Sequence, residues 1–462
     1  MSGDGEAGLF GELPEASGPA RPAGGRPRLR RAERGQVELR ALSLEQLMPA
    51  EHRVRQVWAF AEALELGPLY ARIKAVEGHA GHPPADPRVL LALWLYAVVE
   101  GVGSARELAR LCGEHLAFQW LCGGVSVNPK TLSDFRTGHG ELLERLLVDG
   151  FAALLKAGVA RLERVAQDGV RVRAAAGAAS FRRLATLERC RQAAVEEVVR
   201  LSRLLEADPG AAGRRQAAAK RRAAEARERR VREALAAAAE LGAQRQARAK
   251  RDGAKRRGDG GDGGDGGDGG VGGGGKEPRA STTDAEARVM KMADGGFRPA
   301  YNAQFATDTA SGLIAGVAVD NLGSDLGKLK PMSERLARDY GRRPAEHLAD
   351  GNFAKLADIA ELAEAGVTVY APVPKPRDLT RQRHAPLPGD PPAVAAWRQR
   401  MGSPEAQAIY KERAATAEWV NAQARNHGLT RFLVRGLKKV KAVLLWHALA
   451  HNMMCLWRLT PA

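Results

Sequence analysis

A run made only of Gly, Asp and one Val occupies residues 258–275, and the rest of the chain must fold around it. Such a composition has almost no apolar surface to bury, so it predicts a flexible linker. The residues before it, 182–257, alternate Ala runs with clusters of Arg, Lys and Glu. That pattern predicts a charged helical hairpin, broken near Asp208-Pro209-Gly210. Residues 182–280 are therefore interpreted as an insertion into a domain that begins before them and resumes after them.

The balance of charges favours a polyanionic partner. The 462 residues include 71 Lys and Arg against 54 Asp and Glu, a net charge of +17. Cations that neutralise phosphates release the counterions around them, so this excess points to nucleic acid. The alternative is an ordinary basic protein whose Arg content is inflated by codon bias in a GC-rich genome.

Cysteine usage and hydropathy favour a cytoplasmic, nucleoid-associated protein. No two of the four cysteines are spaced as C-x₂-C, which argues against a zinc knuckle. Four cysteines in a chain of this length do not form a disulfide framework, and no signal peptide is visible. The longest apolar runs, at 89–99 and 442–446, are too short to span a bilayer.

The N-terminal third predicts a tail and a helical domain. Residues 1–45 are rich in Gly, Pro and Arg and are expected to be a disordered basic tail. Residues 46–160 show helical spacing, with one helix expected over 104–121 and a second from Asn128, where Pro129 takes the first helical position. This helix-turn-helix-like arrangement would offer Lys130, Thr131 and Arg136 to DNA. An ordinary helical bundle with a polar face remains the alternative.

Residues 161–181 and 281–462 predict an α/β domain. Short strands are expected at 164–168, 170–173, 301–307, 313–319, 346–350 and 367–373, with helices at 325–340, 353–365 and 405–426. Asp168 and Asp350 would then lie at strand ends, and Glu418 on the helix that follows the last strand. Taken singly, Asp168 is better explained as part of a turn and Asp350 as a helix cap, and Glu418 could be one more solvated charge, so the interpretation rests on the combination of the three.

Three converging carboxylates would repel one another unless they are protonated or bind metal. Mg²⁺ prefers such oxygen ligands, and Mn²⁺ is expected to substitute for it. Two such ions would activate an attacking hydroxyl and stabilise the leaving oxygen of a phosphodiester.

Helix geometry selects Glu418 over its neighbour Glu412. At about 100° per residue, with Tyr410 at zero, Glu418 falls at about 80° and Arg425 at about 60°. Glu412 falls at about 200°, on the opposite face, and is expected to face solvent.

At these residues the chain resembles bacterial insertion-sequence transposases. Asp168, Asp350 and Glu418 are similar to their DDE triad, and Tyr410, Arg413, Glu418 and Arg425 are similar to their Tyr-Arg-Glu-Lys signature. Residues 282–290 and 301–304 also look like such proteins, and the resemblance covers about 50–182 and 281–457. The chain departs from the pattern of these transposases at two points. Four residues separate Arg413 from Glu418, where three are common, and Gly follows Asp350 directly, where one residue usually comes between them.

The resemblance implies an RNase H-like mixed-sheet catalytic domain, preceded by an all-α helix-turn-helix-like domain. It also implies binding of terminal inverted repeats, hydrolysis, strand transfer into target DNA, and a homo-oligomer on DNA. Tyr410, Arg413 and Arg425 would contact DNA. Two alternatives stay open: a catalytically inactive remnant that still binds DNA, and a metal-dependent nuclease that does not join strands.

Overall fold

The computed structural model describes residues 41–78, 81–207, 211–258, 277–376 and 380–459. The expectations of a tail over most of 1–45 and of a linker over nearly all of 258–275 fall outside the described residues. The described elements belong to one compact unit, Leu44–Ala462. No helix in the described part of the chain is long and apolar enough to cross a membrane.

Residues 44–156 contain helices, and polar side chains cap several of them. Asp86, Ser104 and Asn128 each accept a hydrogen bond from a backbone N–H in the first turn that follows. Helix α4 is buried along nearly its whole length, which explains its uninterrupted apolar sequence. The helices are α1 (Leu44–Leu47), α2 (Arg53–Ala63), α3 (Gly67–Tyr70), α4 (Pro87–Val99), α5 (Ala105–Glu114), α6 (Leu116–Cys122), α7 (Pro129–Gly138) and α8 (Gly140–Lys156).

The helix expected over 104–121 is in fact two helices. His115 has an extended backbone, ends α5, and accepts a hydrogen bond from the N–H of Ala117 in α6 through its Nδ1. A ring that caps from inside an otherwise helical pattern gives no periodicity signal, which is why the sequence suggested one continuous helix.

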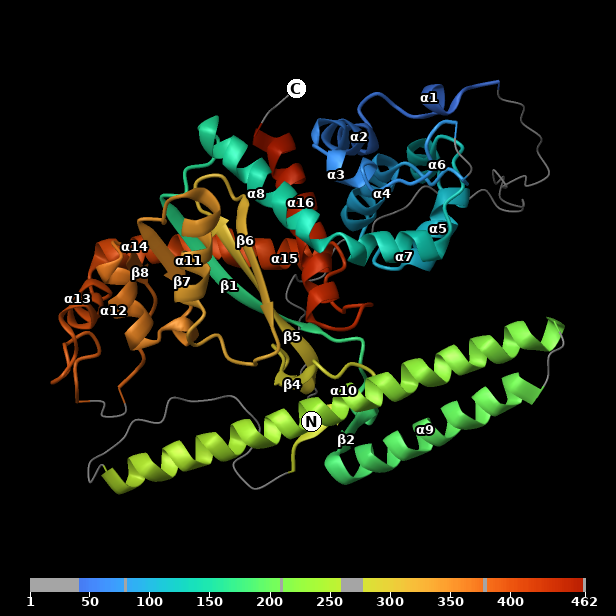
Figure 1. Cartoon of the computed structure of the whole chain (residues 1–462). Coiled ribbons are helices and arrows are strands. Elements are labelled where there is room, and N and C mark those ends of the chain that lie inside the picture. The colour runs from blue at the N-terminus through green and yellow to red at the C-terminus, as the bar shows by residue number, and fades with distance from the viewer. Residues whose placement is uncertain (1–40, 79–80, 208–210, 259–276, 377–379, 460–462) are drawn as a thin grey trace, which may run out of the picture. The chain divides into compact units, whose positions relative to one another are not determined.

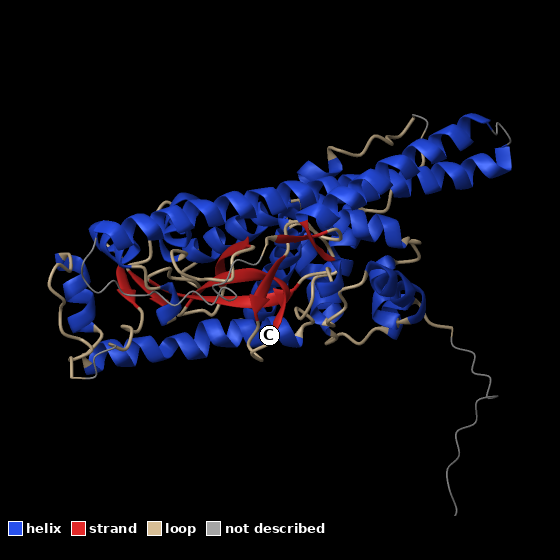
Figure 2. Cartoon of the chain, turned by 90° about the horizontal axis from the view of Figure 1, so that it is seen from below, coloured by secondary structure: helices blue, strands red, loops and turns tan. Residues whose placement is uncertain are grey.

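A mixed sheet forms the centre of the α/β region (Figures 1 and 2). Its strand order is β4-β5-β1-β7-β8, and β6 also pairs with β5. Strand β1 runs antiparallel to β5 and parallel to β7, and β7 runs parallel to β8. The strands are β1 (Arg164–Arg173), β4 (Arg288–Lys291), β5 (Phe297–Asp308), β6 (Ile314–Asp320), β7 (Glu346–Ala349) and β8 (Thr368–Tyr370).

Strand β1 corrects the expectation of two short strands around Gly169. It is continuous, because Gly169 pairs with Gln304 inside the ladder with β5. Its pairing with β7 ends earlier, at Gln167 opposite Ala349. Asp168 is therefore interior to the antiparallel ladder but lies just past the end of the parallel one.

Helices lie on both sides of this sheet (Figure 2). The expected helix 353–365 is shorter, because a 3₁₀ turn, Gly351–Phe353, precedes it. The expected helix 405–426 is present but contains a π-helical turn, Ala414–Glu418. The remaining helices are α11 (Leu329–Tyr340), α12 (Leu356–Glu364), α13 (Pro392–Arg400), α14 (Pro404–Arg413), α15 (Trp419–Asn426) and α16 (Leu437–Leu459).

The segment between β1 and β4 leaves the sheet as a helical hairpin (Figure 1). Helices α9 (Leu184–Ala207) and α10 (Ala211–Gly258) pack against each other, as the charge and Ala pattern predicted. A small antiparallel ladder joins their base, because β2 (Phe181–Arg183) pairs with β3 (Arg279–Ser281). Leu187, Ala234, Ala238 and Ala280 form a separate apolar cluster there.

Candidate active site

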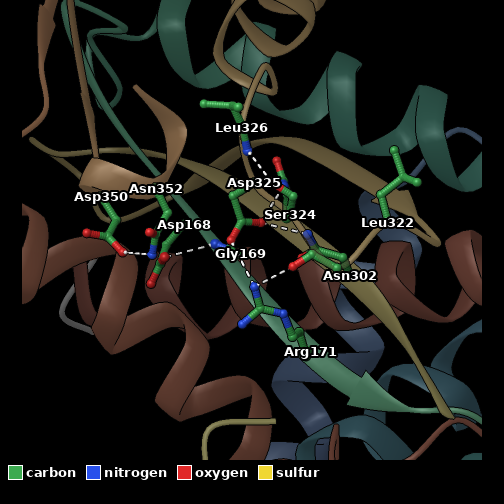
Figure 3. A network of polar contacts seen from close by, with 12 residues as sticks. Asp168, Gly169, Arg171, Asn302, Leu322, Ser324, Asp325, Leu326, Asp350 and Asn352 are labelled. Atoms are coloured by element: carbon green, nitrogen blue, oxygen red, sulfur yellow. Dashed lines mark hydrogen bonds and ion pairs between the residues drawn. The ribbon is translucent and has the colours of Figure 1, made fainter. Parts of the chain in front are cut away.

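Strand register places Asp168 beside Asp350. Gln167 pairs with Ala349 in the parallel ladder, so the next residue on each strand is an Asp. Adjacent strands lie about 4.8 Å apart, which brings the two residues together although 182 positions separate them in the sequence. Figure 3 shows the two carboxyl groups near each other. The predicted juxtaposition of the two strand-end carboxylates is thus present in the backbone.

Hydrogen bonds orient both carboxyl groups. Asp168 accepts from the Gly169 N–H at 2.9 Å and from Asn421 Nδ2 at 3.0 Å. Asp350 accepts from the Gly351 N–H at 2.6 Å and from Asn352 Nδ2 at 2.9 Å. The Gly that directly follows Asp350 thus supplies a backbone donor to it. No sequence pattern singles out Asn421, which reaches Asp168 from α15.

The site raises the pKa of Asp168. Burial is the largest cause, and the negative charge of Asp350 acts in the same direction. The Arg413 guanidinium and the hydrogen bonds from Gly169 and Asn421 lower the pKa but do not offset burial. Two neighbouring carboxyl groups, one of them poorly solvated, form a site that a cation stabilises.

Arg413 supplies a positive charge beside these groups. Its Nη1 lies 3.5 Å from Asp168 Oδ2, and its Nη2 lies 2.6 Å from Glu418 Oε1. The Arg413 side chain is only 13% exposed, whereas that of Glu418 is 51% exposed. The guanidinium therefore lies between the partly buried Asp168 carboxylate and the exposed Glu418 carboxylate.

The π-helical turn explains how Arg413 and Glu418 meet across five positions. In a regular α-helix, neighbours on one face are three or four residues apart. One extra residue in the turn makes Glu418 equivalent to an i+4 neighbour of Arg413. The four-residue separation noted in the sequence is thus absorbed by the backbone, and the side chains still share a face.

The three predicted carboxylates do not form a closed cluster. Within the described residues, no group of three or more His, Cys, Asp and Glu side chains is arranged to hold a metal ion. Asp168 and Asp350 come together, while Glu418 is joined to them through Arg413.

The donor set nevertheless fits a hard divalent cation. Asp168 and Asp350 offer carboxylate oxygens, which are the ligands that a hard divalent cation prefers. The Arg413 guanidinium already forms ion pairs with two carboxylates, those of Asp168 and Glu418, as a metal cation would. Burial of the Asp168 carboxylate makes such a charge more favourable than it would be in solvent.

Glu412 differs from the expectation of a free solvent-facing charge. It points away from Glu418, as helix geometry predicted, but it forms an ion pair with Arg164 at 2.5 Å. Arg164 also pairs with Glu346 at 2.5 Å, and these two residues are register partners on β1 and β7. The missed partner is on a strand 248 residues away, which no local pattern reveals.

Tyr410 and Arg425 lie on the same helical segment as Glu418. The Arg413 Cζ atom lies 5.7 Å from the centroid of the Tyr410 ring, a cation–π contact. Burial raises the pKa of Tyr410 above its usual range, so its hydroxyl stays protonated and can donate. Arg425 is exposed in the last turn of α15.

The opposite face of β1 carries a polar network that sequence reasoning missed (Figure 3). Asp325 accepts hydrogen bonds from Asn302 Nδ2 at 2.6 Å and from Gln304 Nε2 at 3.1 Å. Arg171 Nη2 lies 3.5 Å from the same carboxylate. These contacts hold the loop after β6 against the back of the strand that carries Asp168.

Gly169 is required by this packing. A Cβ atom there would lie 2.7 Å from Asp325 Oδ1 and 3.1 Å from Asn302 Oδ1. The Gly that suggested a turn is present because a carboxylate approaches the backbone.

The residues proposed for DNA contact on α7 divide into two groups. Lys130 is 85% exposed and forms an ion pair with Asp134, and Thr131 is partly exposed with its N–H bonded to Asn128. Arg136 is a correction: its guanidinium is buried, lies 4.8 Å from the Trp94 ring centroid, and donates to the Gly103 carbonyl. It supports the helical core and is not available to a phosphate.

Two family models match the chain. A transposase domain (DUF772) matches residues 42–138, and a transposase DDE domain matches residues 387–457. The first spans α1 to α7, and the second contains the helix with Tyr410, Arg413 and Glu418. No curated protein and no solved structure matches the chain. The two matches support an insertion-sequence transposase with a DDE domain, and hence an enzyme acting on DNA.

Proposed function

We propose that this chain binds the terminal inverted repeats of an insertion sequence and catalyses phosphodiester hydrolysis followed by strand transfer. The observation that carries the proposal is the register of β1 and β7, which sets Asp168 beside Asp350 under the helix that bears Glu418. In this proposal residues 161–181 and 281–462 form one RNase H-like catalytic domain. Residues 46–160 form the helical DNA-binding domain, and 182–280 the insertion.

The triad Asp168, Asp350 and Glu418 would hold divalent cations, Mg²⁺ or Mn²⁺. Such ions, when bound, supply activation of the attacking oxygen and stabilisation of the leaving oxygen. For Glu418 to join the two Asp residues, the Arg413 guanidinium must release it. Phosphate oxygens are the natural alternative partners of that guanidinium, since Arg binds them through two parallel hydrogen bonds.

The chain's own residues would orient the DNA backbone. Arg413 would hold a non-bridging phosphate oxygen next to the carboxylates, and the protonated Tyr410 hydroxyl would donate a hydrogen bond to the same phosphodiester. Arg425 would contact the adjoining phosphate. Asn421 and the Gly169 N–H keep Asp168 in one orientation while these contacts form.

The test is cleavage of a duplex carrying the repeats that flank this gene, with Mg²⁺ or Mn²⁺ added to the purified protein. Nicked ends and joined products are expected. Nicking without joined products would indicate a nuclease that does not transfer strands. Binding without nicking would indicate an inactive remnant, an alternative favoured by the separation of Glu418 from Asp168 by Arg413.

A further inference from the structure

Helix α10 carries a large share of the chain's positive charge. Its 48 residues contain sixteen Lys and Arg against five Asp and Glu, a net charge of +11 of the chain's +17. Its hairpin partner α9 has four of each sign and is neutral. At 1.5 Å per residue α10 is roughly 72 Å long. The charge is therefore concentrated on one long, straight element.

The buried and basic residues of α10 occupy opposite faces. Ala224, Val231, Ala234 and Ala238 are buried against the neighbouring structure. With Ala224 at zero and about 100° per residue, these four fall between roughly −80° and 0°. Arg215, Arg222 and Arg229 fall between about 140° and 180°, on the far side of the helix. They are spaced seven residues apart, so they form one row with about 10 Å between successive members.

The three arginines of this row are exposed and are not neutralised by carboxylates. None forms an ion pair within the described residues, whereas Arg221 pairs with Glu225 at 3.2 Å and Arg232 with Glu228 at 3.9 Å. The three guanidinium groups are therefore accessible to an anionic partner.

Cations also lie close together where α10 approaches the loop before α16. Burial lowers the pKa of Arg230, and the charge of Arg435, in the loop before α16, lowers it further. Like charges held together are unfavourable, and a polyanion relieves the repulsion.

We propose that the row Arg215, Arg222 and Arg229 on α10 binds the phosphate backbone of double-stranded DNA. The proposal rests on the proposed function for the identity of the polyanion. Guanidinium groups bind phosphate oxygens through two hydrogen bonds. Three evenly spaced guanidinium groups in one row can each contact a phosphate of the regularly repeating DNA backbone. Contacts to phosphates carry no sequence information, so the row would add affinity to any duplex, within or outside the terminal repeat.

The experiment compares two triple variants of the full chain on a duplex of about 40 base pairs, by anisotropy over a range of salt concentrations. The test variant is Arg215→Gln, Arg222→Gln and Arg229→Gln. The matched control is Arg189→Gln, Arg191→Gln and Arg203→Gln, which removes three exposed arginines from α9. Gln retains helix propensity, and circular dichroism checks the helical content.

The α10 variant is expected to bind the duplex about tenfold more weakly, or weaker still. The magnitude of the slope of log K against log salt should also fall by about two to three, because each lost phosphate contact accounts for roughly 0.9. The α9 control should retain most of the wild-type affinity and slope. An unchanged affinity in the α10 variant would overturn the proposal. So would an equal loss in both variants, which would reflect net charge alone, or an altered oligomeric state with unaltered DNA affinity.

Cleavage separates this proposal from the proposed function. At saturating duplex the α10 variant should cleave at the wild-type rate, because the row lies outside the carboxylate site. A wild-type protein that binds duplex through α10 but never cleaves would refute the catalytic proposal and leave the binding proposal standing.

Discussion

Arg413 and Glu418 are five residues apart in the sequence, yet their side chains form an ion pair of 2.6 Å. A regular α-helix would place them about 140° apart, on different faces. The π-helical turn Ala414–Glu418 removes about 100° of that separation by adding one residue to the turn. The angle of about 80° expected for Glu418 relative to Tyr410 is therefore closer to −20°, near the position of Arg413.

Deleting Ala415 should leave cleavage activity within about an order of magnitude of wild type, because the π turn then becomes a regular α-helical turn and the Arg–Glu pair keeps one face. Inserting one Ala after Ala415 should abolish cleavage, because it turns the Glu side chain away by about 100°. Cleavage assays on both variants give the answer. Equal activity in the insertion variant would mean that the position of Glu418 on the helix does not matter.

Asp350→Asn should reduce cleavage by several orders of magnitude while leaving DNA affinity nearly unchanged. Asn retains an oxygen for the Gly351 N–H but loses the charge that attracts a hard divalent cation. Paired cleavage and binding assays test this. Wild-type cleavage by Asp350→Asn would refute the site assignment.

Glu418→Gln and Glu412→Gln should have opposite consequences. Glu418→Gln should lose cleavage with little change in stability, because its side chain is exposed. Glu412→Gln should keep cleavage and lose at most about 1 kcal/mol of stability, because it weakens a partly exposed ion pair with Arg164. The reverse pattern of activities would show that Glu412 is the residue at the site.

Gly169→Ala should destabilise the protein by about 1–3 kcal/mol, since the new methyl group must displace the Asp325 carboxylate from the back of β1. Gly177→Ala is the matched control, because nothing lies within 4 Å of a Cβ atom there. Thermal melts of both variants measure the difference. A Gly169→Ala melting temperature equal to that of the control would show that the loop moves away at no cost.

Stability should fall as the pH falls from about 6.5 to about 4, partly because of His347. Burial lowers the pKa of His347 to about 4, and neither ring nitrogen has a partner among the described residues. The unfolded chain binds the proton first, so the stability present above pH 6.5 is lost as the pH falls towards the folded pKa. His347→Leu should flatten this loss by a few kcal/mol, at about 1.4 kcal/mol per unit of pKa. Urea unfolding at several pH values measures this loss of stability, and His82→Leu, at an exposed position, is the control. Parallel pH profiles for His347→Leu and the wild type would show that His347 does not cause the loss.

The elements that are local in sequence were predictable, and the contacts between them were not. Apolar alternation and Ala-rich charge patterns predicted most strands and the α9–α10 hairpin, and the strand-end position predicted that Asp350 would lie near Asp168. The continuity of β1 through Gly169 was missed, because a Gly next to an Asp suggests a turn when the approaching Asp325 is unknown. The π turn was visible in the sequence only as one residue too many between Arg413 and Glu418.

The ladder between Phe181 and Ser281 fixes where the hairpin enters and leaves the rest of the chain. Paired strands hold the two attachment points about 5 Å apart, however many residues lie between them. The hairpin therefore joins β2 to β3 over a short distance, as a tight turn joins two strands. A different module whose own termini lie close together would replace residues 184–276 only if it also covered Ala280, which packs against Leu187, Ala234 and Ala238 of the hairpin. The short junction between β2 and β3 is thus the place at which such a module would have to be attached.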